Sequence, residues 1–498
     1  MTETNRDVIV IGAGNAAFCA ALAASDEGAS VLVLERAPEE ENGGNSRFTA
    51  GAMRFAYDGV DDLRELMPDL SPEEIETTDF GTYTEDQFFD DMFRITQYRC
   101  DPALTELLVR HSKSTMMWMQ KKGVRFAPIY GRQAFKIDGR FKFWGGLTVE
   151  AWGGGPGLVD SLTAAARKRQ IEIWYNARAT ELIFDGEAVI GVRVRRAGGK
   201  PEDILAGAVV IASGGFQANP EMRTRYLGPG WETAKVRGSR FNTGEGIVMA
   251  LAIGAASYGN WSGSHSVGWE RNAPEFGDLA VGDQFQKHSY PFGIMVNATG
   301  RRFVDEGADF RNYTYAKYGG VVLNQPGQFA WQIFDGKVKH LLRAEYNIRQ
   351  VTKVTAPTLE ELAPQLEGVN AAAFLEEISA YNNAVNDQVP FNPNVKDARR
   401  TDGLAIDKTN WANRIDEPPY EAYAITCGIT FTFGGLRVNT DAQVLDTDHR
   451  PIPGLYAAGE LVGGIFYFNY PGGSGLMSGA VFGRIAGNSA GRATISES

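Results

Sequence analysis

The first 35 residues contain the pattern that most restricts the fold of this chain. A short apolar run, 7–11, is followed by Gly12-Ala13-Gly14-Asn15-Ala16-Ala17, by an alanine-rich segment to about Ala24, and by a second apolar run, 30–34, that ends at Glu35. Short continuous apolar runs of this kind fill buried parallel strands, and the alanine-rich segment between them reads as a helix. The pattern is therefore a complete β-α-β unit and indicates an α/β fold.

The glycine turn of this unit also predicts a ligand. Gly12, Gly14 and Ala17 match the G-x-G-x-x-G/A pattern, in which the first glycine permits a tight turn and the second lets a pyrophosphate approach the helix N-terminus. The small third residue lets the helix pack on its strand. Glu35 stands where a carboxylate accepts hydrogen bonds from an adenosine ribose. The sequence therefore predicts a dinucleotide-binding site.

Composition excludes several classes of protein. The chain has 498 residues, of which 43% are hydrophobic and 22% charged, as in an average globular protein. Its net charge of −12 argues against nucleic acid or an anionic membrane as partner, since both require dense Lys and Arg. The N-terminus lacks the apolar region of a signal peptide, and no window approaches the 18 apolar residues of a membrane span. We expect a soluble, cytoplasmic protein.

The cysteines exclude some redox centres. Cys19, Cys100 and Cys427 are far apart and form no CxxC pair. Three cysteines cannot supply the four thiolates of an iron–sulfur cluster, and no CxxCH haem-attachment motif occurs. We therefore expect no metal site, and a reducing compartment suits this cysteine content.

The β-α-β rhythm is interrupted once along the chain. Between about 260 and 430 the frequency of aromatic residues, Pro and Asn rises, and strands and helices mix; after 430, buried-strand character returns and a final helix begins near Gly473. We predict a discontinuous domain over 1–259 and 431–498, with 260–430 inserted as a cap.

Three further glycine-rich segments carry a family signature. They are Gly43-Gly44-Asn45-Ser46-Arg47-Phe48-Thr49-Ala50-Gly51, Ile211-Ala212-Ser213-Gly214-Gly215 and Pro453-Gly454-Leu455-Tyr456-Ala457-Ala458-Gly459-Glu460. In the first, glycines let the backbone lie flat against a planar ligand, and Ser46 and Thr49 can bond a phosphate or a ring nitrogen. Together with the first turn, these motifs make the chain resemble the succinate dehydrogenase/fumarate reductase flavoprotein superfamily over essentially its whole length.

This resemblance implies a Rossmann-like FAD-binding domain with an inserted α+β capping domain. In that family the first turn holds the ADP half of FAD, the segment like 43–51 runs along the flavin, and the late Gly-Glu contacts the cofactor chain. Members with covalent FAD use a His near 43–51, and none stands there, so FAD is expected to be noncovalent. The residues that the resemblance places on FAD are Gly12, Gly14, Asn15, Ala16, Glu35, Arg36, Gly44, Asn45, Ser46, Ala50, Gly51, Ala177, Ser213, Gly214, Gly215, Glu460, Gly475 and Leu476.

The resemblance also implies catalytic residues in the inserted region. In fumarate reductases a Gly-x-Arg-Phe motif is followed by an Arg that exchanges the proton while flavin N5 exchanges the hydride; here Gly300-Arg301-Arg302-Phe303 is followed by Arg311. An Arg can serve as acid or base only where its neighbours lower its affinity for the proton. His265 occupies the place of a family His that holds a substrate carboxylate.

Several family positions differ in this chain. The proton relay of the family has a Glu and an Arg where this chain has Gln286 and Ser289, with His288 and Tyr290 beside them. Phe431 replaces a second substrate His, and Tyr470 replaces a carboxylate-binding Arg. The loss of these two dicarboxylate contacts argues against plain fumarate or succinate as the substrate.

The tail Asn469-Tyr470-Pro471-Gly472-Gly473-Ser474-Gly475-Leu476 looks most like that of tricarballylate dehydrogenases. We therefore predict an FAD-dependent oxidoreductase that introduces or reduces a C=C bond next to a carboxylate or carbonyl, with Arg311, His265 and Tyr470 in catalytic roles. Its partners would be a small carboxylate or ketone substrate and a separate electron acceptor.

Two enzymatic alternatives and one non-enzymatic alternative stay open. They are a 3-ketosteroid dehydrogenase-like enzyme, which predicts an essential Tyr470 or Tyr290 and a dispensable Arg311, a fumarate-reductase-type enoate reductase, and a non-catalytic carrier of the FAD scaffold. A steroid pocket would be lined by aromatic residues, for which the candidates are Trp261, Trp269, Phe431, Phe433, Phe466, Tyr467 and Phe468; most aromatic residues, however, belong to protein cores.

Overall fold

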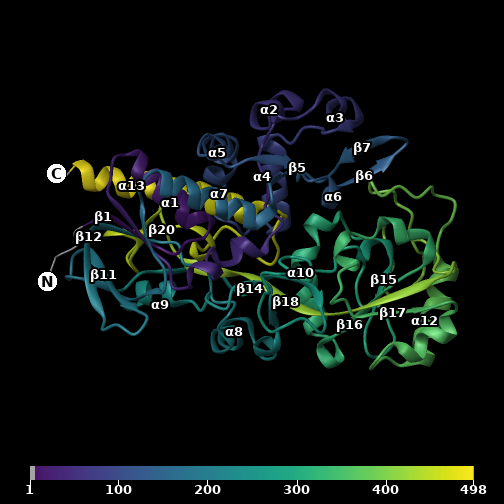
Figure 1. Ribbon diagram of the computed structural model, residues 1–498. Helices are drawn as coiled ribbons and strands as arrows, with labels where there is room; N and C mark the ends of the chain where they lie inside the picture. Colours follow the sequence, from purple (N-terminus) through teal and green to yellow (C-terminus); the bar gives the residue numbers. More distant parts are fainter. Residues whose placement is uncertain (1–5, 497–498) are drawn as a thin grey trace.

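The computed structural model describes residues 6–496, so the outermost residues of the predicted discontinuous domain lie outside the described part (Figure 1). Within this range the two largest sheets have eight and six strands. In Figure 1 they lie side by side, with most of the helices of the first half of the chain above them. No helix in residues 6–496 combines the length and apolar character needed to cross a membrane.

The eight-stranded sheet has the predicted β-α-β unit at its centre. β1 (Arg6–Ile11) pairs in parallel with β2 (Val31–Leu34) and with β12 (Glu202–Ile211), and α1 (Asn15–Asp26) connects β1 to β2. The strand order is β10-β11-β12-β1-β2-β9, and β20 pairs with both β12 and β19. The other strands are β9 (Glu172–Trp174), β10 (Ala177–Phe184), β11 (Val189–Arg196), β19 (Gln443–Leu445) and β20 (Pro451–Ala457). The predicted α/β fold is confirmed.

The two helices that meet the glycine turn pack against each other at very short range. The glycines of α13 (Ser474–Ser496) recur every fourth residue and therefore lie on one face of that helix. A Cβ on Gly483 would lie 2.4 Å from the Ala16 carbonyl oxygen, and a Cβ on Gly487 would lie 2.1 Å from that of Ala20. Only glycine allows this approach, which brings the start of α13 next to the start of α1.

The six-stranded sheet is organised around one long strand, β18 (Tyr420–Leu436). β18 pairs with β13 (Lys235–Val236), β14 (Ser257–Glu270), β16 (Ala330–Phe334) and β17 (Lys353–Ala356), and β16 pairs with β15 (Ile294–Val296). β14 runs through position 259 and β18 through position 430 without a break. The division of the chain at these two positions stays a prediction.

The remaining elements surround these two sheets. The helices are α2 (Val60–Leu66), α3 (Pro72–Thr77), α4 (Glu85–Ile95), α5 (Pro102–Lys121), α6 (Tyr130–Gln133), α7 (Gly154–Lys168), α8 (Pro220–Leu227), α9 (Glu245–Ala252), α10 (Tyr315–Leu323), α11 (Leu359–Leu362) and α12 (Ala371–Ala384). The small sheets contain β3 (Ala52–Met53), β4 (Thr78–Asp79), β5 (Phe126–Pro128), β6 (Ala134–Ile137), β7 (Arg140–Phe143) and β8 (Val149–Ala151).

Candidate active site

One large cavity, with about 1650 Å³ of empty space including its mouth, extends from the glycine turn to the six-stranded sheet. All three predicted catalytic residues line it: Arg311, His265 and Tyr470. So do 16 of the predicted FAD contacts, namely Gly12, Gly14, Asn15, Ala16, Glu35, Arg36, Gly44, Asn45, Ser46, Ala50, Ala177, Ser213, Gly214, Glu460, Gly475 and Leu476. The fold thus brings together residues that are more than 400 positions apart in the chain.

We call the part of the cavity around residues 12–16 and 35–36 the glycine-turn end. Gly12 has φ +113°, and a Cβ there would lie 2.5 Å from the Ala212 carbonyl oxygen, so this turn requires glycine. Immediately after it, the Asn15 amide donates to Ser46 Oγ at 3.1 Å. The Glu35 carboxylate is buried, and its Oε1 accepts the Ala37 amide at 2.7 Å.

Segment 43–51 forms the wall next to this turn. It contains a short 3-10 helix, η2 (Gly44–Phe48). Asn45 fastens the segment to the six-stranded sheet, since its Nδ2 donates to the Thr430 carbonyl oxygen at 2.6 Å and its Oδ1 accepts the Ser239 amide at 2.8 Å. This segment therefore connects the glycine-turn end to the other half of the cavity.

Gly51 and Gly215, the other two predicted FAD contacts, are not among the residues that line the cavity. A Cβ on Gly51 would lie 2.6 Å from the backbone of Gly154, and a Cβ on Gly215 would lie 2.1 Å from Thr432 Oγ1 and 2.2 Å from Glu460 Oε1. Their small size lets the cavity wall close behind the site.

Glu460 is buried and held by hydrogen-bond donors. Its Oε1 accepts the Thr432 amide at 2.7 Å and the Thr432 hydroxyl at 3.1 Å, and its Oε2 accepts Gln217 Nε2 at 3.2 Å. Burial raises the pKa of Glu460 to about 7 in spite of these donors. The carboxylate ties the short 3-10 helix η10 (Gly459–Leu461) to β18.

The glycine-turn end fits the ADP half of FAD. The start of α1 presents backbone N–H groups and the positive end of the helix dipole to the cavity, which suits a pyrophosphate. The close approach at Gly12 leaves no room for a Cβ, and Glu35 supplies a buried carboxylate for a ribose. Backbone groups, glycines and one acid therefore supply the chemistry that a dinucleotide needs.

We call the opposite part of the cavity, around Arg132, Arg237 and Arg311, the arginine end. Arg311 begins the 3-10 turn η5 (Arg311–Tyr313) and is buried. Its Nη2 donates to the Arg132 carbonyl oxygen at 2.7 Å. Among residues 6–496, no carboxylate oxygen lies within 4.0 Å of its guanidinium nitrogens.

The surroundings of Arg311 weaken its hold on its proton. Burial lowers the pKa of Arg311; the Glu345 carboxylate acts in the opposite direction, and the positive charge of Arg132 adds to the lowering. A neutral guanidine is therefore less costly here than on a surface arginine, which is the condition for acid–base chemistry by this group.

Two buried histidines, His288 and His265, also line this part of the cavity, and Tyr315 meets both rings edge-on. Arg311 Nη1 lies 3.4 Å from His288 Nδ1; since a guanidinium only donates, Nδ1 accepts and the His288 proton lies on Nε2. Nε2 of His288 and Nε2 of His265 are both buried without a hydrogen-bond partner among the described residues. Burial, together with nearby arginines, lowers the pKa of both histidines well below the usual value. Both rings are therefore neutral at pH 7.

A pair of arginines that the sequence analysis did not single out completes this end. Asp283 joins them: Arg132 Nη1 lies 2.8 Å from Asp283 Oδ2, and Arg237 Nη2 lies 2.6 Å from Asp283 Oδ1. Gln286 Nε2 also donates to Asp283 Oδ2, at 2.9 Å. Arg311 also lines this end of the cavity but makes no ion pair with Asp283. Among the described residues that line the arginine end, three guanidinium groups therefore face one carboxylate, and positive charge is in excess.

Tyr470 lies against His265 rather than in a separate pocket. The two rings are stacked, with centroids 4.6 Å apart and planes at 19°, and Tyr315 meets both rings edge-on. Burial raises the pKa of Tyr470, although a hydrogen bond with Tyr315 opposes the rise. Tyr470 is therefore a neutral hydroxyl at the cavity wall.

Some of the other residues considered in the sequence analysis line the cavity, and others pack behind its wall. Phe431 lines the cavity and is the single member of the seven candidate pocket aromatics that does so among the described residues. Tyr290 does not line it and instead contacts Thr314 Oγ1 at 2.6 Å. Ser289 is also behind the wall, where its hydroxyl accepts the Arg343 amide at 3.1 Å.

Comparison with known proteins agrees with this geometry. The family model described as "FAD binding domain" matches residues 7–476. The chain belongs to the FAD binding domain family. It is also 30% identical to a probable fumarate reductase, Ifc3, of Shewanella frigidimarina (strain NCIMB 400), over 98% of this chain and 75% of that protein.

Two further matches are a reductase and a dehydrogenase. A solved structure of the open conformation of a flavocytochrome c3 fumarate reductase superposes with a TM-score of 0.73 at 28% identity, covering 99% of this chain and 79% of that one. A 3-oxosteroid 1-dehydrogenase of Mycolicibacterium smegmatis (strain ATCC 700084 / mc(2)155) is 27% identical over 98% of this chain and 97% of that protein.

The chain is therefore an FAD-dependent oxidoreductase of the fumarate reductase/succinate dehydrogenase flavoprotein family. It acts on a C=C bond or on the corresponding CH–CH group. FAD is its cofactor, as the resemblance implied.

Proposed function

We propose that this enzyme oxidises a CH–CH group next to a carboxylate of a small polycarboxylic acid, as a tricarballylate dehydrogenase does, or catalyses the reverse reduction. The observation that carries the proposal is the arginine end, where Arg132, Arg237 and Arg311 line the cavity with a single carboxylate, Asp283, which pairs with Arg132 and Arg237. An excess of buried positive charge is costly unless an anion compensates it, and guanidinium groups bind carboxylates in a planar, bidentate manner.

The two unpartnered histidine nitrogens support the same class of substrate. Nε2 of His288 is a buried donor without a partner among the described residues, Nε2 of His265 is likewise unpartnered there, and both rings meet Tyr315 edge-on. Because a carboxylate offers about four acceptor sites, it can satisfy such donors and arginines together. His265 would orient one carboxylate, and Tyr470 would contact the same group through its hydroxyl.

Arg311 would transfer the proton at the carbon next to the oxidised bond. Its lowered pKa and its place in the cavity wall support this role. When bound, FAD would exchange the hydride at its flavin ring. Gly44, Ser46 and Ala50 would support the flavin half, and since no His occurs in 43–51 we infer that FAD is held noncovalently. A separate electron acceptor would reoxidise it.

The ketosteroid alternative is supported by the tyrosine pair. Tyr315 and Tyr470 lie together at the cavity wall, and both have raised pKa values because they are buried. A steroid, however, is uncharged and apolar, so it would leave the charges of the arginine end uncompensated. The same charges support an enoate reductase only if its substrate is a polycarboxylate.

The test is an anaerobic titration of the purified, flavin-loaded protein, in which bleaching of the flavin absorption band is followed. The panel contains tricarballylate, succinate and a 3-ketosteroid, and a second series offers fumarate to protein that a reduced dye has bleached. We expect tricarballylate to bleach the flavin. In Arg237→Gln the half-saturating tricarballylate concentration should rise about 10- to 100-fold, the value of a hydrogen bond to a charged group.

A matched control is Arg178→Gln, which removes a guanidinium from the glycine-turn end of the same cavity, where Arg178 pairs with Glu245. It should leave the tricarballylate titration unchanged. Bleaching by the steroid alone would favour the ketosteroid alternative, with Tyr470 as the catalytic residue. Reoxidation of bleached protein by fumarate without any bleaching by saturated acids would make the enzyme a reductase.

A further inference from the structure

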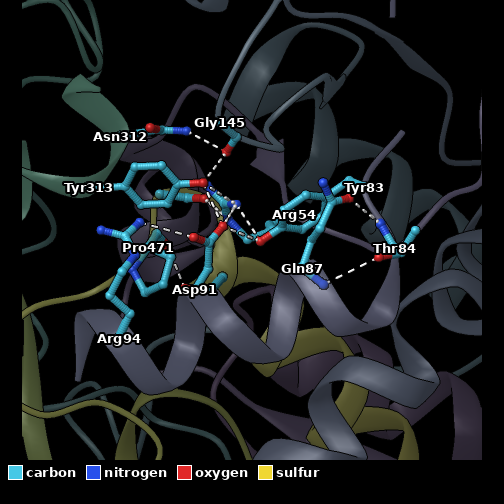
Figure 2. A network of polar contacts seen from close by, with 12 residues as sticks. Arg54, Tyr83, Thr84, Gln87, Asp91, Arg94, Gly145, Asn312, Tyr313 and Pro471 are labelled. Atoms are coloured by element: carbon cyan, nitrogen blue, oxygen red, sulfur yellow. Dashed lines mark hydrogen bonds and ion pairs between the residues drawn. The ribbon is translucent and has the colours of Figure 1, made fainter. Parts of the chain in front are cut away.

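A second group of charged residues lies outside the cavity, beside the turn that carries Arg311 (Figure 2). Its centre is Asp91 on α4. Asp91 Oδ2 accepts the Tyr83 hydroxyl at 2.7 Å and the Tyr313 hydroxyl at 2.5 Å, and it lies 3.3 Å from Arg54 Nη1. Its Oδ1 accepts Arg94 Nη2 at 3.0 Å. One carboxylate thus receives four donors.

Arg54 is the residue that makes the loss of these contacts destabilising. Its side chain is completely buried, its Nη1 donates to the Tyr83 hydroxyl at 2.7 Å, and its Nε donates to the Gly472 carbonyl oxygen at 2.8 Å. The guanidinium carbon lies 5.1 Å from the ring centre of Tyr83 and 5.2 Å from that of Tyr313. Asp91 is the carboxylate that compensates its charge, and a buried arginine without one is strongly destabilising.

The group is connected to the segments that carry the candidate catalytic residues. Tyr313 ends the turn that Arg311 begins. The residue between them, Asn312, donates from Nδ2 to the Gly145 carbonyl oxygen at 2.7 Å and accepts the Gly472 amide at 2.8 Å. Asn469 Nδ2 also donates to the Tyr313 carbonyl oxygen at 2.7 Å, so residues on either side of Tyr470 hold this turn.

The turn itself supplies little rigidity. A 3-10 turn of three residues has few and poorly aligned backbone hydrogen bonds. Within the cavity, the Arg311 guanidinium donates to one carbonyl oxygen and lies 3.4 Å from one histidine nitrogen. The position of its nitrogens therefore depends on how firmly the backbone of residues 311–313 is held from behind.

We propose that Asp91 and Tyr313 are positioning residues for Arg311: through the Tyr313 hydroxyl, the Asp91 carboxylate fixes the 311–313 turn so that the Arg311 guanidinium faces the reacting carbon. The inference rests on the proposed function, because it takes Arg311 as the proton-transfer residue. Its consequence is that residues outside the cavity control the rate of the reaction without contacting the substrate.

The test compares Tyr313→Phe, which removes one hydroxyl and keeps the ring, with Asp91→Asn. The control is Asp90→Asn, on the same helix but exposed. In both test variants, hydrogen exchange at the amides of residues 311–314 should become about tenfold faster. With the substrate that the wild type oxidises, kcat should fall about 10- to 100-fold, the effect of a displacement of about 1 Å, and the solvent isotope effect on kcat should rise. Flavin content and KM should stay near wild type.

The double variant Asp91→Asn/Tyr313→Phe distinguishes positioning from general weakening. If the two residues act through one contact, its kcat should equal that of the slower single variant rather than the product of both losses. A double variant whose fall in kcat is the product of the two single falls would overturn the inference. So would test variants in which the amides of residues 311–314 exchange no faster than in Asp90→Asn. An Arg311→Lys variant with wild-type kcat would overturn the proposed function, and the positioning role with it. Faster amide exchange in the Asp91 and Tyr313 variants would then show only that these residues stabilise the turn.

Discussion

The two ends of the cavity are built in different ways. The glycine-turn end is formed largely by backbone groups between residues 12 and 46, close together in the sequence, and its buried carboxylate, Glu35, follows the second strand directly. The arginine end is formed by side chains from separate segments of the chain, with Arg132, Arg237, His265 and Arg311 all far apart. The glycine turn therefore depends mainly on local conformation, whereas the arginine end depends on the tertiary fold.

The electrostatics of the two ends differ in the same sense. At the glycine-turn end, Arg36 and Arg178 both pair with Glu245 at a partly exposed site. At the arginine end, Arg132 and Arg237 pair with the buried Asp283, Arg311 makes no ion pair with it, and the neighbouring histidines are neutral. Solvent screens the first group of charges and not the second, so substitutions at the two ends should have unequal effects.

The largest effect should come from Arg311→Ala. Because this change removes the proposed proton-transfer group, kcat should fall by about 10²- to 10⁴-fold, the usual contribution of a general acid or base. Flavin content, measured by absorbance, should be unchanged because Arg311 lies at the other end of the cavity. Arg301→Gln, on the exposed neighbouring motif, is the control, and equal activities of the two variants would contradict the assignment.

The second-largest effect should come from Gly12→Ala at the glycine-turn end. The new Cβ would overlap the Ala212 carbonyl oxygen at a left-handed backbone position, and we expect a loss of about 2–4 kcal/mol in the free energy of unfolding together with loss of FAD. Chemical denaturation and flavin absorbance measure the two effects. Gly28 is also left-handed, but apart from its chain neighbours none of the residues 6–496 has an atom within 4 Å of the new Cβ, so Gly28→Ala should retain FAD; a similar loss there would show that backbone strain alone is responsible.

A smaller, pH-dependent effect should come from Glu460→Gln. The folded state raises the pKa of Glu460 to about 7 from a usual 4.5, so it binds the proton more tightly than the unfolded chain does. The free energy of unfolding should therefore fall as pH rises from about 4.5 to about 7, by on the order of 3 kcal/mol from this group, and the variant should lack this slope.

Denaturation at a series of pH values tests this prediction. Glu150, in β8, is the matched control: burial raises its pKa to about 7 as well, but it does not line the cavity. Glu150→Gln should remove its own part of the slope and leave FAD affinity unchanged, whereas Glu460→Gln should also weaken FAD. Equal FAD affinities in the two variants would remove Glu460 from the cofactor site.

The smallest effect should come from Glu245→Gln at the partly exposed rim of the glycine-turn end. Ion pairs in contact with solvent contribute about 0–1 kcal/mol, so the free energy of unfolding should change by less than about 1 kcal/mol, and added salt should reduce the difference further. Thermal denaturation at low and high salt measures it. A larger change that persists in salt would mean that this end, too, depends on unscreened charge.

Much of the fold could be read from the sequence because its signals are local. The apolar run 7–11, the glycine turn and the run 30–34 each depend on neighbours a few residues away, and the structure contains the predicted strands and helix there. Gly51 and Gly215 show what a local pattern cannot predict. Their motifs form the cavity wall, but the motif does not show whether a given glycine lines the cavity or packs behind it.

The β-α-β unit, the dinucleotide chemistry and, through the motifs, the family could all be predicted from the amino-acid sequence. Two contacts become visible only in the folded chain: Arg132 and Arg237 share Asp283 in the cavity that Arg311 also lines, and Tyr470 stacks on His265. The physical reason is that a glycine turn is a backbone conformation encoded by its own residues. A cluster of buried charges, by contrast, is a sum of long-range contacts, and a charged residue in the sequence does not indicate which distant residue will compensate it.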